Sequence, residues 1–320
     1  RLRLTRDRWR HSRRTGRRAG YVGLGAMGRP LARHLVGKHT LTVYDLSPSA
    51  VAAFEELGAR SASSCAELAR GCDVVLLCLP RSQDVQQVLF APQGLAEGLA
   101  PGAVVIDQTS GLPEKTREFT RRLAEQGVSM LDAPVSGAMA LAVAGTISII
   151  VSGPRDVFER VEPVLRDISP NVLYCGQRVG NGQALKSVNN FLSVCCRFST
   201  LEIVALGRKL GLSMEAMTEA LNWTAGRSYT SQGMLPAIMA GRASTKFHLA
   251  LMIKDMNQAM TLGLDAGVPM PIGSAARGLL QIGLGLQGPD AQLEEMIGVV
   301  ERMAATRFVD STEQEKAGRA

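Results

Sequence analysis

Between Ala19 and Gly176 of this 320-residue chain, short apolar runs alternate with amphipathic segments. Uninterrupted apolar runs of this length are typical of strands that are buried on both faces. The alternation therefore predicts a doubly wound α/β domain, in which helices cover both faces of a parallel sheet. The expected strands are 19–23, 41–45, 73–80, 103–107, 128–135, 146–153 and 171–175, and the expected helices include 26–37, 48–57, 82–90, 114–126 and 154–167.

The pattern changes to purely helical spacing after residue 180. From 183 to 210 there is no proline, and apolar residues recur every three or four positions at Leu185, Val188, Leu192, Cys195, Leu201 and Val204. Such a helix would be ~40 Å long, enough to be the spine of a second domain. Further helices are expected at 213–222, 229–240, 247–266, 271–285 and 289–305, with no convincing strand. The sequence thus predicts an α/β domain at 19–180 and an all-α domain at 181–308.

Both ends of the chain are expected to lie outside these domains. Residues 1–18 contain nine Arg and one Asp without periodic apolar spacing, which predicts a disordered tail. The same composition is found in transit peptides and in polybasic arms. The other residues include 27 basic and 28 acidic side chains, so the charge of +7 does not predict a nucleic-acid-binding face. Residues 309–320 are polar and are expected to be frayed.

The cysteines and histidines do not form a metal-binding pattern. Six cysteines are scattered, mostly in apolar runs, and no two form a CxxC pair. This usage is typical of reduced thiols and predicts a cytoplasmic protein without disulfides or a bound metal. No apolar run approaches the ~20 residues of a membrane-spanning helix, so no membrane association is expected.

The glycine run Gly23-Leu24-Gly25-Ala26-Met27-Gly28 lies between an expected strand and an expected helix. In that context Gly23 would form the tight turn, Gly25 would let a pyrophosphate approach the backbone, and Gly28 would let the helix pack on the strand. The spacing predicts a Rossmann-type dinucleotide site that also includes Leu24, Ala26 and Met27. A plain strand-turn-helix connection is the structural alternative.

Asp45 ends the next expected strand, twenty residues after Gly25. A carboxylate there can accept hydrogen bonds from the adenosine ribose but would repel a 2′-phosphate. The following residues, Leu46, Ser47 and Pro48, contribute no Arg to offset that repulsion. The sequence therefore favours NAD as the cofactor over NADP.

Four stretches of the chain resemble the β-hydroxyacid dehydrogenase family, which contains 3-hydroxyisobutyrate dehydrogenase and tartronate semialdehyde reductase. They are VGLGAMG (22–28), DAPVSGA (132–138), GQRVGNGQALKSVNN (176–190) and FHLALMIKDMNQA (247–259). Their order and spacing agree across residues 19–308. The resemblance implies a Rossmann-type domain joined by a long interdomain helix to an all-α domain of the 6-phosphogluconate dehydrogenase type.

This resemblance also implies roles for individual residues. Lys186 would be the general acid/base, Asn190 would bind substrate, and Ser136 with Gly137 would hold its carboxylate. Ala138 stands where the family usually has a second glycine, which leaves the substrate's identity open. The implied further cofactor contacts are Leu79, Pro80, Thr109, Phe247 and Lys254. Thr109 could instead cap a helix, and Lys254 could simply pair with Asp255.

Lys186 also has the chemistry that alcohol oxidation requires. A hydroxyl proton must leave as hydride is transferred to nicotinamide, and the reverse reaction returns it. A free lysine, with a pKa near ~10.4, is too protonated to act as a base at neutral pH. The positive end of the long helix and a dry interdomain cleft are expected to lower the pKa of Lys186. Asn190 is one helical turn further on the same face. A solvated surface lysine is the structural alternative.

These observations predict an NAD-dependent dehydrogenase that reversibly oxidises a small 3-hydroxy acid, similar to 3-hydroxyisobutyrate. One alternative is an NADPH-dependent reductase of glyoxylate or tartronate semialdehyde. Another is a non-catalytic dinucleotide-binding protein whose basic arm binds nucleic acid. The apolar helical domain is expected to form a homodimer or homotetramer, with neither nucleic acid nor membrane as a partner in the first interpretation.

Overall fold

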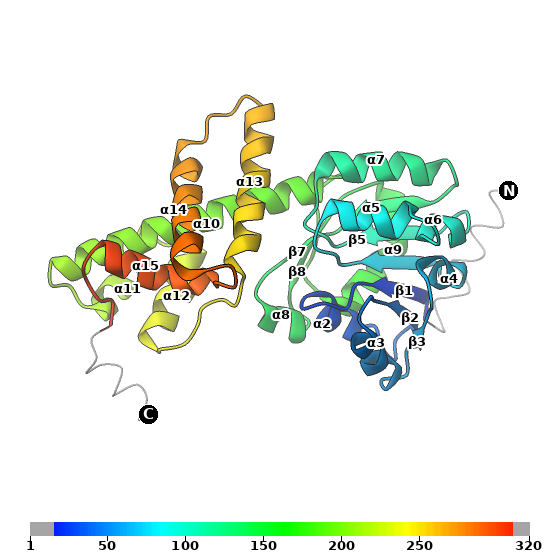
Figure 1. The fold of residues 1–320 in the computed structure, drawn as a ribbon, viewed down its shortest axis with the longest axis horizontal. Helices are drawn as coiled ribbons and strands as arrows, with labels where there is room; N and C mark the ends of the chain where they lie inside the picture. Colours follow the sequence, from blue (N-terminus) through cyan, green and yellow to red (C-terminus); the bar gives the residue numbers. More distant parts are fainter. Residues whose placement is uncertain (1–15, 310–320) are drawn as a thin grey trace. The chain divides into compact units, whose positions relative to one another are not determined.

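The computed structural model describes residues 16–309, which form two compact units that divide between Lys186 and Ser187. The first unit is a doubly wound α/β domain and the second is helical, so the predicted fold class is confirmed (Figure 1). The sequence places the boundary near residue 180, whereas the division falls within the long helix.

The main sheet of the first unit has six parallel strands in the order β3-β2-β1-β4-β5-β6. Because the order reverses between β1 and β4, a ligand can bind beyond their carboxyl ends. The apolar runs do not predict β3, because it has only two residues and both are exposed. The strands are β1 (Arg18–Val22), β2 (Thr40–Tyr44), β3 (Arg60–Ser61), β4 (Val74–Leu77), β5 (Val104–Asp107) and β6 (Ser129–Asp132).

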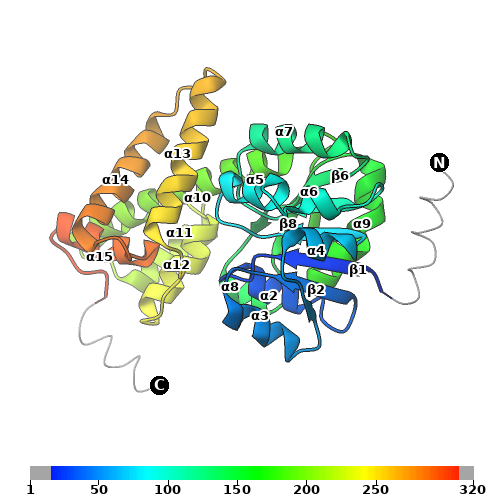
Figure 2. The ribbon, with the colours of Figure 1, turned by 45° about the vertical axis from the view of Figure 1, so that its right-hand side comes forward.

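Two layers of helices cover this sheet because successive strand residues point to opposite faces. Val74 and Leu76 belong to one apolar core, and Val75 and Leu77 belong to the other. The helices that contribute to the first core are α2 (Gly28–Arg33), α3 (Pro48–Glu55), α8 (Met139–Val143) and α9 (Arg155–Ile168). Those that contribute to the second are α4 (Cys65–Arg70), α5 (Ser82–Phe90), α6 (Leu95–Gly98) and α7 (Pro113–Ala124). Figures 1 and 2 show α2 and α3 on one side of the sheet and α5 and α7 on the other.

A second, three-stranded sheet corrects the expectation of purely parallel pairing. It contains β7 (Val135–Ser136), β8 (Ser148–Val151) and β9 (Val172–Tyr174), and β7 is antiparallel to β8. The single strand expected at 128–135 is divided after Asp132. Pro134 lies at the division, where its missing N–H removes a hydrogen-bond donor from the strand.

The folded part of the chain begins before the end of the predicted Arg-rich tail. Arg18 is the first residue of β1, and its guanidinium makes two hydrogen bonds to the Asp73 carboxylate, at 2.7 and 3.1 Å. The prediction of a tail through residue 18 is therefore wrong for its last positions. Residues 1–15 and 310–320 lie outside the described part of the chain.

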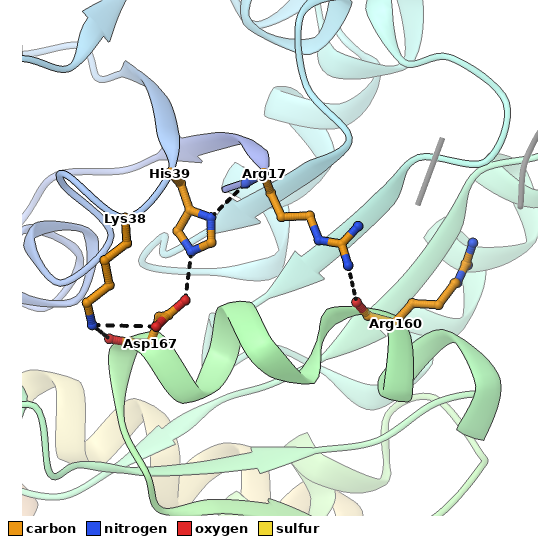
Figure 3. Close-up of polar contacts among 5 residues, drawn as sticks. All are labelled: Arg17, Lys38, His39, Arg160 and Asp167. Carbon is orange, nitrogen blue, oxygen red and sulfur yellow. Dashed lines mark hydrogen bonds and ion pairs between the residues drawn. The ribbon is translucent and has the colours of Figure 1, made fainter. Parts of the chain in front are cut away.

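His39, whose side chain is 5% exposed, links this first segment to α9 (Figure 3). His39 Nδ1 accepts a hydrogen bond from the Arg17 backbone N–H at 3.0 Å, so Nε2 carries the proton and donates to Asp167 Oδ2, also at 3.0 Å. Lys38 Nζ donates to the Asp167 carbonyl oxygen, and Arg17 donates to that of Arg160. Burial lowers the pKa of His39, which is neutral in this arrangement.

The stability of the first unit is expected to fall in acid because of His39. Protonation occurs more readily in the unfolded chain, whose histidine has a pKa near 6.5, so the contribution of neutral His39 is lost as the pH falls below that value. Urea unfolding between pH 5 and 8 would measure this. The His39→Asn variant keeps an acceptor for the Arg17 N–H. It is expected to lower the free energy of unfolding by about 1 kcal/mol at pH 7 and to reduce the dependence of that free energy on pH in acid. Parallel slopes for both proteins would contradict the assignment.

The second unit is built around the long helix α10 (Asn181–Lys209), whose later turns bury Val194, Phe198, Leu201 and Val204. No strand occurs among its described residues. Contrary to the predicted apolar face, Leu185, Val188 and Leu192 near the helix start are exposed. The other elements are α11 (Met214–Trp223), α12 (Tyr229–Met239), α13 (Leu249–Asp265), α14 (Pro271–Gln287), η1 (Leu293–Glu295) and α15 (Met296–Met303).

By length and composition alone, α10 could cross a membrane, contrary to the expectation from the apolar runs. Half of its most apolar window is buried in the protein. A core helix of a folded domain passes the same test, and α10 contributes buried residues to the second apolar core. The feature is therefore weak evidence for a membrane span.

Candidate active site

The glycine loop follows β1 and has the geometry predicted for it. Gly23 has φ +95°, and a side chain there would overlap the Cys78 carbonyl oxygen. A Cβ on Gly28 would overlap the carbonyl oxygen of Gly23, so this glycine permits close contact between α2 and the loop. A Cβ on Gly25 would meet no atom within 4 Å. The first and third glycines therefore serve packing, and the second leaves open space beside the backbone.

Asp45 lies directly after β2 and is linked to the same loop. Its Oδ2 accepts a hydrogen bond from the Leu24 N–H at 2.6 Å, and its Oδ1 accepts one from Ser47 N–H at 2.8 Å. The side chain is half-buried. Each carboxylate oxygen can accept more than one hydrogen bond, so these contacts leave acceptor capacity for a ribose hydroxyl.

The loop and the start of α2 fit a dinucleotide pyrophosphate. Met27 is the N-cap of α2, and no side chain caps that helix end. The open space beside Gly25 gives a phosphate access to the backbone there. Ala26 lies between Gly25 and the N-cap residue Met27 in the chain. The residues present are thus compatible with a nicotinamide dinucleotide.

Leu79 and Thr109 join the carboxyl ends of β4 and β5. The Thr109 hydroxyl accepts a hydrogen bond from the Leu79 N–H at 3.1 Å, and the Thr109 N–H donates to Asp107 Oδ1 at 2.9 Å. Thr109 is buried, and the N-cap of α7 is Leu112, so the alternative of a helix-capping Thr109 is wrong. Pro80 is exposed at the same edge of the sheet.

A buried polar cluster that the sequence analysis did not predict closes the start of α10. Asp132, at the end of β6, accepts hydrogen bonds from the N–H groups of Gly180 and Gln183, at 2.7 and 2.9 Å. The Ser152 hydroxyl donates to Asp132 and accepts from the Gly182 N–H at 3.0 Å. The Asp132 carboxylate also offsets the positive charge of this helix end, which is one of the two influences on Lys186 expected from the sequence.

The side chain of Gln183 extends this cluster to β5 and α7. Gln183 Nε2 donates to Asp107 Oδ2 at 3.3 Å, and its Oε1 accepts from the Thr116 hydroxyl at 2.8 Å. Burial raises the pKa of Asp107 to about 7, and the nearby Asp132 carboxylate acts in the same direction. The pKa of Asp132 is also raised, mainly by burial. A sequence signal for these residues exists only in retrospect, as acidic residues at the ends of two apolar runs.

Lys186 lies in the second turn of α10 and is half-buried. It belongs to the first unit, together with the glycine loop and the polar cluster. Ser136, half-buried in β7, and Gly137, exposed with φ +146°, come just before α8. The structure therefore places the predicted proton-transfer residue in the unit that carries the dinucleotide loop.

The remaining predicted residues belong to the second unit, where one carboxylate links two of them. Asn190 Nδ2 donates to Asp255 Oδ2 at 2.8 Å, and Lys254 Nζ lies 3.0 Å from Asp255 Oδ1. The pair with Asp255 that was the alternative for Lys254 is therefore present, and it joins a partly exposed lysine to a buried aspartate. Phe247 precedes α13 and packs against the second apolar core. No feature of the sequence alone assigns Asp255 to the site.

The cysteines of residues 16–309 are free thiols. Burial raises the pKa of Cys72 and of Cys78 to about 12, so both thiols stay protonated at neutral pH. Within this part of the chain no group of three or more His, Cys, Asp or Glu side chains could hold a metal ion.

Two family models match the chain and divide it near the same place as the fold. Residues 18–176 match the NAD-binding domain of 6-phosphogluconate dehydrogenase. Residues 180–300 match the domain described as NAD-binding of NADP-dependent 3-hydroxyisobutyrate dehydrogenase. Together these matches cover both units and agree with the glycine loop at the end of β1.

Relatives of similar length are dehydrogenases of hydroxy acids. The chain is 35% identical to 2-(hydroxymethyl)glutarate dehydrogenase of Eubacterium barkeri, over 88% of this chain and 96% of that one. It is 34% identical to 3-hydroxyisobutyrate dehydrogenase of Pseudomonas aeruginosa, over 82% and 90%. The solved structure of Mycobacterium tuberculosis 3-hydroxyisobutyrate dehydrogenase with L-serine has a TM-score of 0.82 at 26% identity, covering 89% of this chain and 99% of that one.

The fold, the glycine loop and these relatives define an NAD(P)-dependent oxidoreductase that acts on CH–OH groups. Within that class, the chain belongs to the β-hydroxyacid dehydrogenase family.

Proposed function

We propose that this enzyme oxidises a small 3-hydroxy acid, similar to 3-hydroxyisobutyrate, with NAD, and that Lys186 exchanges the hydroxyl proton. The observation that carries the proposal is the attachment of α10 to the carboxyl ends of β5 and β6 by Asp107 and Asp132. The glycine loop lies at the carboxyl end of β1 in the same sheet. The helix that carries the proton-transfer residue and the dinucleotide loop thus both begin at the carboxyl edge of the same sheet.

In this mechanism the bound nicotinamide supplies the hydride acceptor for oxidation and the hydride donor for reduction. Lys186 Nζ takes the hydroxyl proton in oxidation and returns it in reduction. The Ser136 hydroxyl and the Gly137 backbone bind the substrate carboxylate, and the Asn190 amide orients the reacting hydroxyl. Asp255 holds Asn190 in place, and it leaves the second amide hydrogen of Asn190 available.

The preference for NAD rests on Asp45. Its carboxylate is held beside the loop by the Leu24 N–H, where a 2′-phosphate would meet a negative charge. An NADP-dependent enzyme is the second candidate, for two reasons. The family that residues 180–300 match is that of an NADP-dependent 3-hydroxyisobutyrate dehydrogenase, and the similar structure of Psf3 contains NADP+. Psf3 has a TM-score of 0.77 at 26% identity, covering 88% of this chain and 99% of that one.

A panel of 3-hydroxy acids and the corresponding semialdehydes, assayed with both cofactors, tests this proposal. We expect turnover of at least one 3-hydroxy acid with a kcat/KM at least tenfold higher for NAD than for NADP, equivalent to ~1.4 kcal/mol of discrimination. Asp45→Asn removes the repelling charge and keeps an acceptor for the Leu24 N–H, so this ratio is expected to fall. A wild-type preference for NADP would refute the cofactor assignment, and inactivity across the panel would refute the proposed function.

A further inference from the structure

We propose that Asp132 and Gln183 are positioning residues for Lys186, holding the first turn of α10 so that the lysine amine meets the substrate hydroxyl. The proposal rests on the proposed function and adds two residues to its machinery. Both residues act through Lys186, and neither is proposed to touch substrate or cofactor. All three belong to the first unit.

The start of α10 is held by partners from distant parts of the chain. Four N–H groups in succession have acceptors here, because Gly180 and Gln183 bond to Asp132, Gly182 bonds to Ser152, and Asn181 bonds to the Arg178 carbonyl oxygen. The first N–H groups of a helix have no partner within the helix and otherwise need water or a ligand. The N–H groups at this helix end are therefore satisfied by protein acceptors, and three of them attach the helix to the ends of β6 and β8.

Close packing of the backbone reinforces this attachment. A Cβ on Gly182 would lie 2.6 Å from the Ile150 carbonyl oxygen and 2.8 Å from Asp132 Oδ2. Both distances are shorter than a carbon atom tolerates, so only glycine lets the helix start approach β8 and the carboxylate this closely. The first turn consequently has little freedom to slide along its axis.

Gln183 fixes the rotation of the helix as well as its position. Its side chain is buried and bonds to Asp107, to the Thr109 carbonyl oxygen and to the Thr116 hydroxyl. Residues three apart in a helix lie on neighbouring positions of one face, so anchoring Gln183 also orients Lys186. Thr109 bonds in turn to Leu79, which connects the anchor to the edge of the sheet where the cofactor is expected.

Accurate placement of the amine matters because proton transfer requires a heavy-atom distance of about 2.6–3.2 Å. A displacement of about 1 Å can lower the rate about 100-fold. Asp132 is well suited to the task because its two oxygens accept from donors on both sides. An amide at this position would direct an N–H toward another N–H. This explains why a buried carboxylate is used although burial raises its pKa.

A double-mutant cycle with Gln183→Met and Lys186→Ala tests the proposal. Methionine keeps the length of the side chain, and the backbone contacts to Asp132 remain. We expect Gln183→Met to lower kcat at least tenfold in the wild-type background and to leave the residual rate of Lys186→Ala unchanged. An equal fall in both backgrounds, or no fall in the first, would overturn the positioning role. Inactivity of the wild-type enzyme would instead refute the proposed function.

A second measurement does not depend on turnover. Acetylation of the protein by acetic anhydride, followed by peptide mass spectrometry, reports the reactivity of each lysine amine. We expect Gln183→Met and Asp132→Asn to change the labelling rate of Lys186 at least threefold and to leave Lys209, an exposed residue at the other end of α10, unchanged. Asp73→Asn is the matched control, because Asp73 is a buried aspartate that lies just before β4, at the opposite end of the sheet. An unchanged rate for Lys186 in the two variants, or an equal change in Asp73→Asn, would overturn the proposal.

Discussion

Replacing Lys186 with alanine is expected to lower kcat by about 10³-fold, within the range that general acid/base catalysis contributes. The variant removes the only side-chain atom proposed to exchange the substrate proton, whereas the glycine loop and Asp45 remain intact. The dissociation constant of NAD is therefore expected to stay within twofold of the wild-type value. Steady-state kinetics at saturating substrate, with cofactor binding measured by calorimetry, would separate the two effects.

The control is Lys209→Ala, which removes an exposed lysine from the last turn of the same helix. This variant is expected to keep wild-type kcat. If Lys186→Ala retained more than a tenth of wild-type turnover on a competent substrate, the proton would have to leave by another route. The proposed mechanism would then be wrong even if the family and the cofactor were correctly assigned.

The second large effect concerns substitutions of two glycines in one loop, one of which is expected to lower stability and the other to weaken NAD binding. Gly28→Ala forces a methyl group against the Gly23 carbonyl oxygen, and overpacking of this kind costs about 1–3 kcal/mol of unfolding free energy. Gly25→Ala meets no protein atom and is expected to leave the unfolding free energy within about 0.5 kcal/mol of wild type. Its methyl group would occupy the space of the pyrophosphate and weaken NAD binding about 10–100-fold.

Urea unfolding and calorimetric titration with NAD, applied to both variants, would measure these quantities. Gly278→Ala provides the comparison, since Gly278 lies in α14 and a Cβ there also meets no atom within 4 Å. Gly278→Ala is expected to leave NAD affinity unchanged and not to lower the free energy of unfolding. Wild-type NAD binding by Gly25→Ala would show that the open space in the loop does not receive the pyrophosphate.

The sequence alone was sufficient for features that depend on local spacing. The alternation of apolar runs predicts most strands of the first unit to within a few residues, because a strand buried on both faces must be apolar throughout. It misses the short, exposed β3 and does not separate β6 from β7. The glycines at 23, 25 and 28 are identifiable from their spacing between a strand and a helix. The structure adds that a Cβ on Gly23 or Gly28 would overlap a carbonyl oxygen, whereas a Cβ on Gly25 would meet no atom. The family resemblance then supplies Lys186 and Asn190, whose spacing in one helix is also local.

Only the tertiary structure reveals the residues that hold this machinery in place. Asp132 and Gln183 are 51 positions apart in the chain, and Asp107 and Gln183 are 76 apart. Their hydrogen bonds exist because β5 and β6 are neighbours in the sheet and α10 begins at their carboxyl ends. Contacts between such distant residues produce no periodic pattern in the sequence. Whether a carboxylate is buried is likewise decided by the residues that pack around it in the folded protein. Local spacing thus determined the elements and the cofactor loop, whereas strand order and packing decided which polar groups meet.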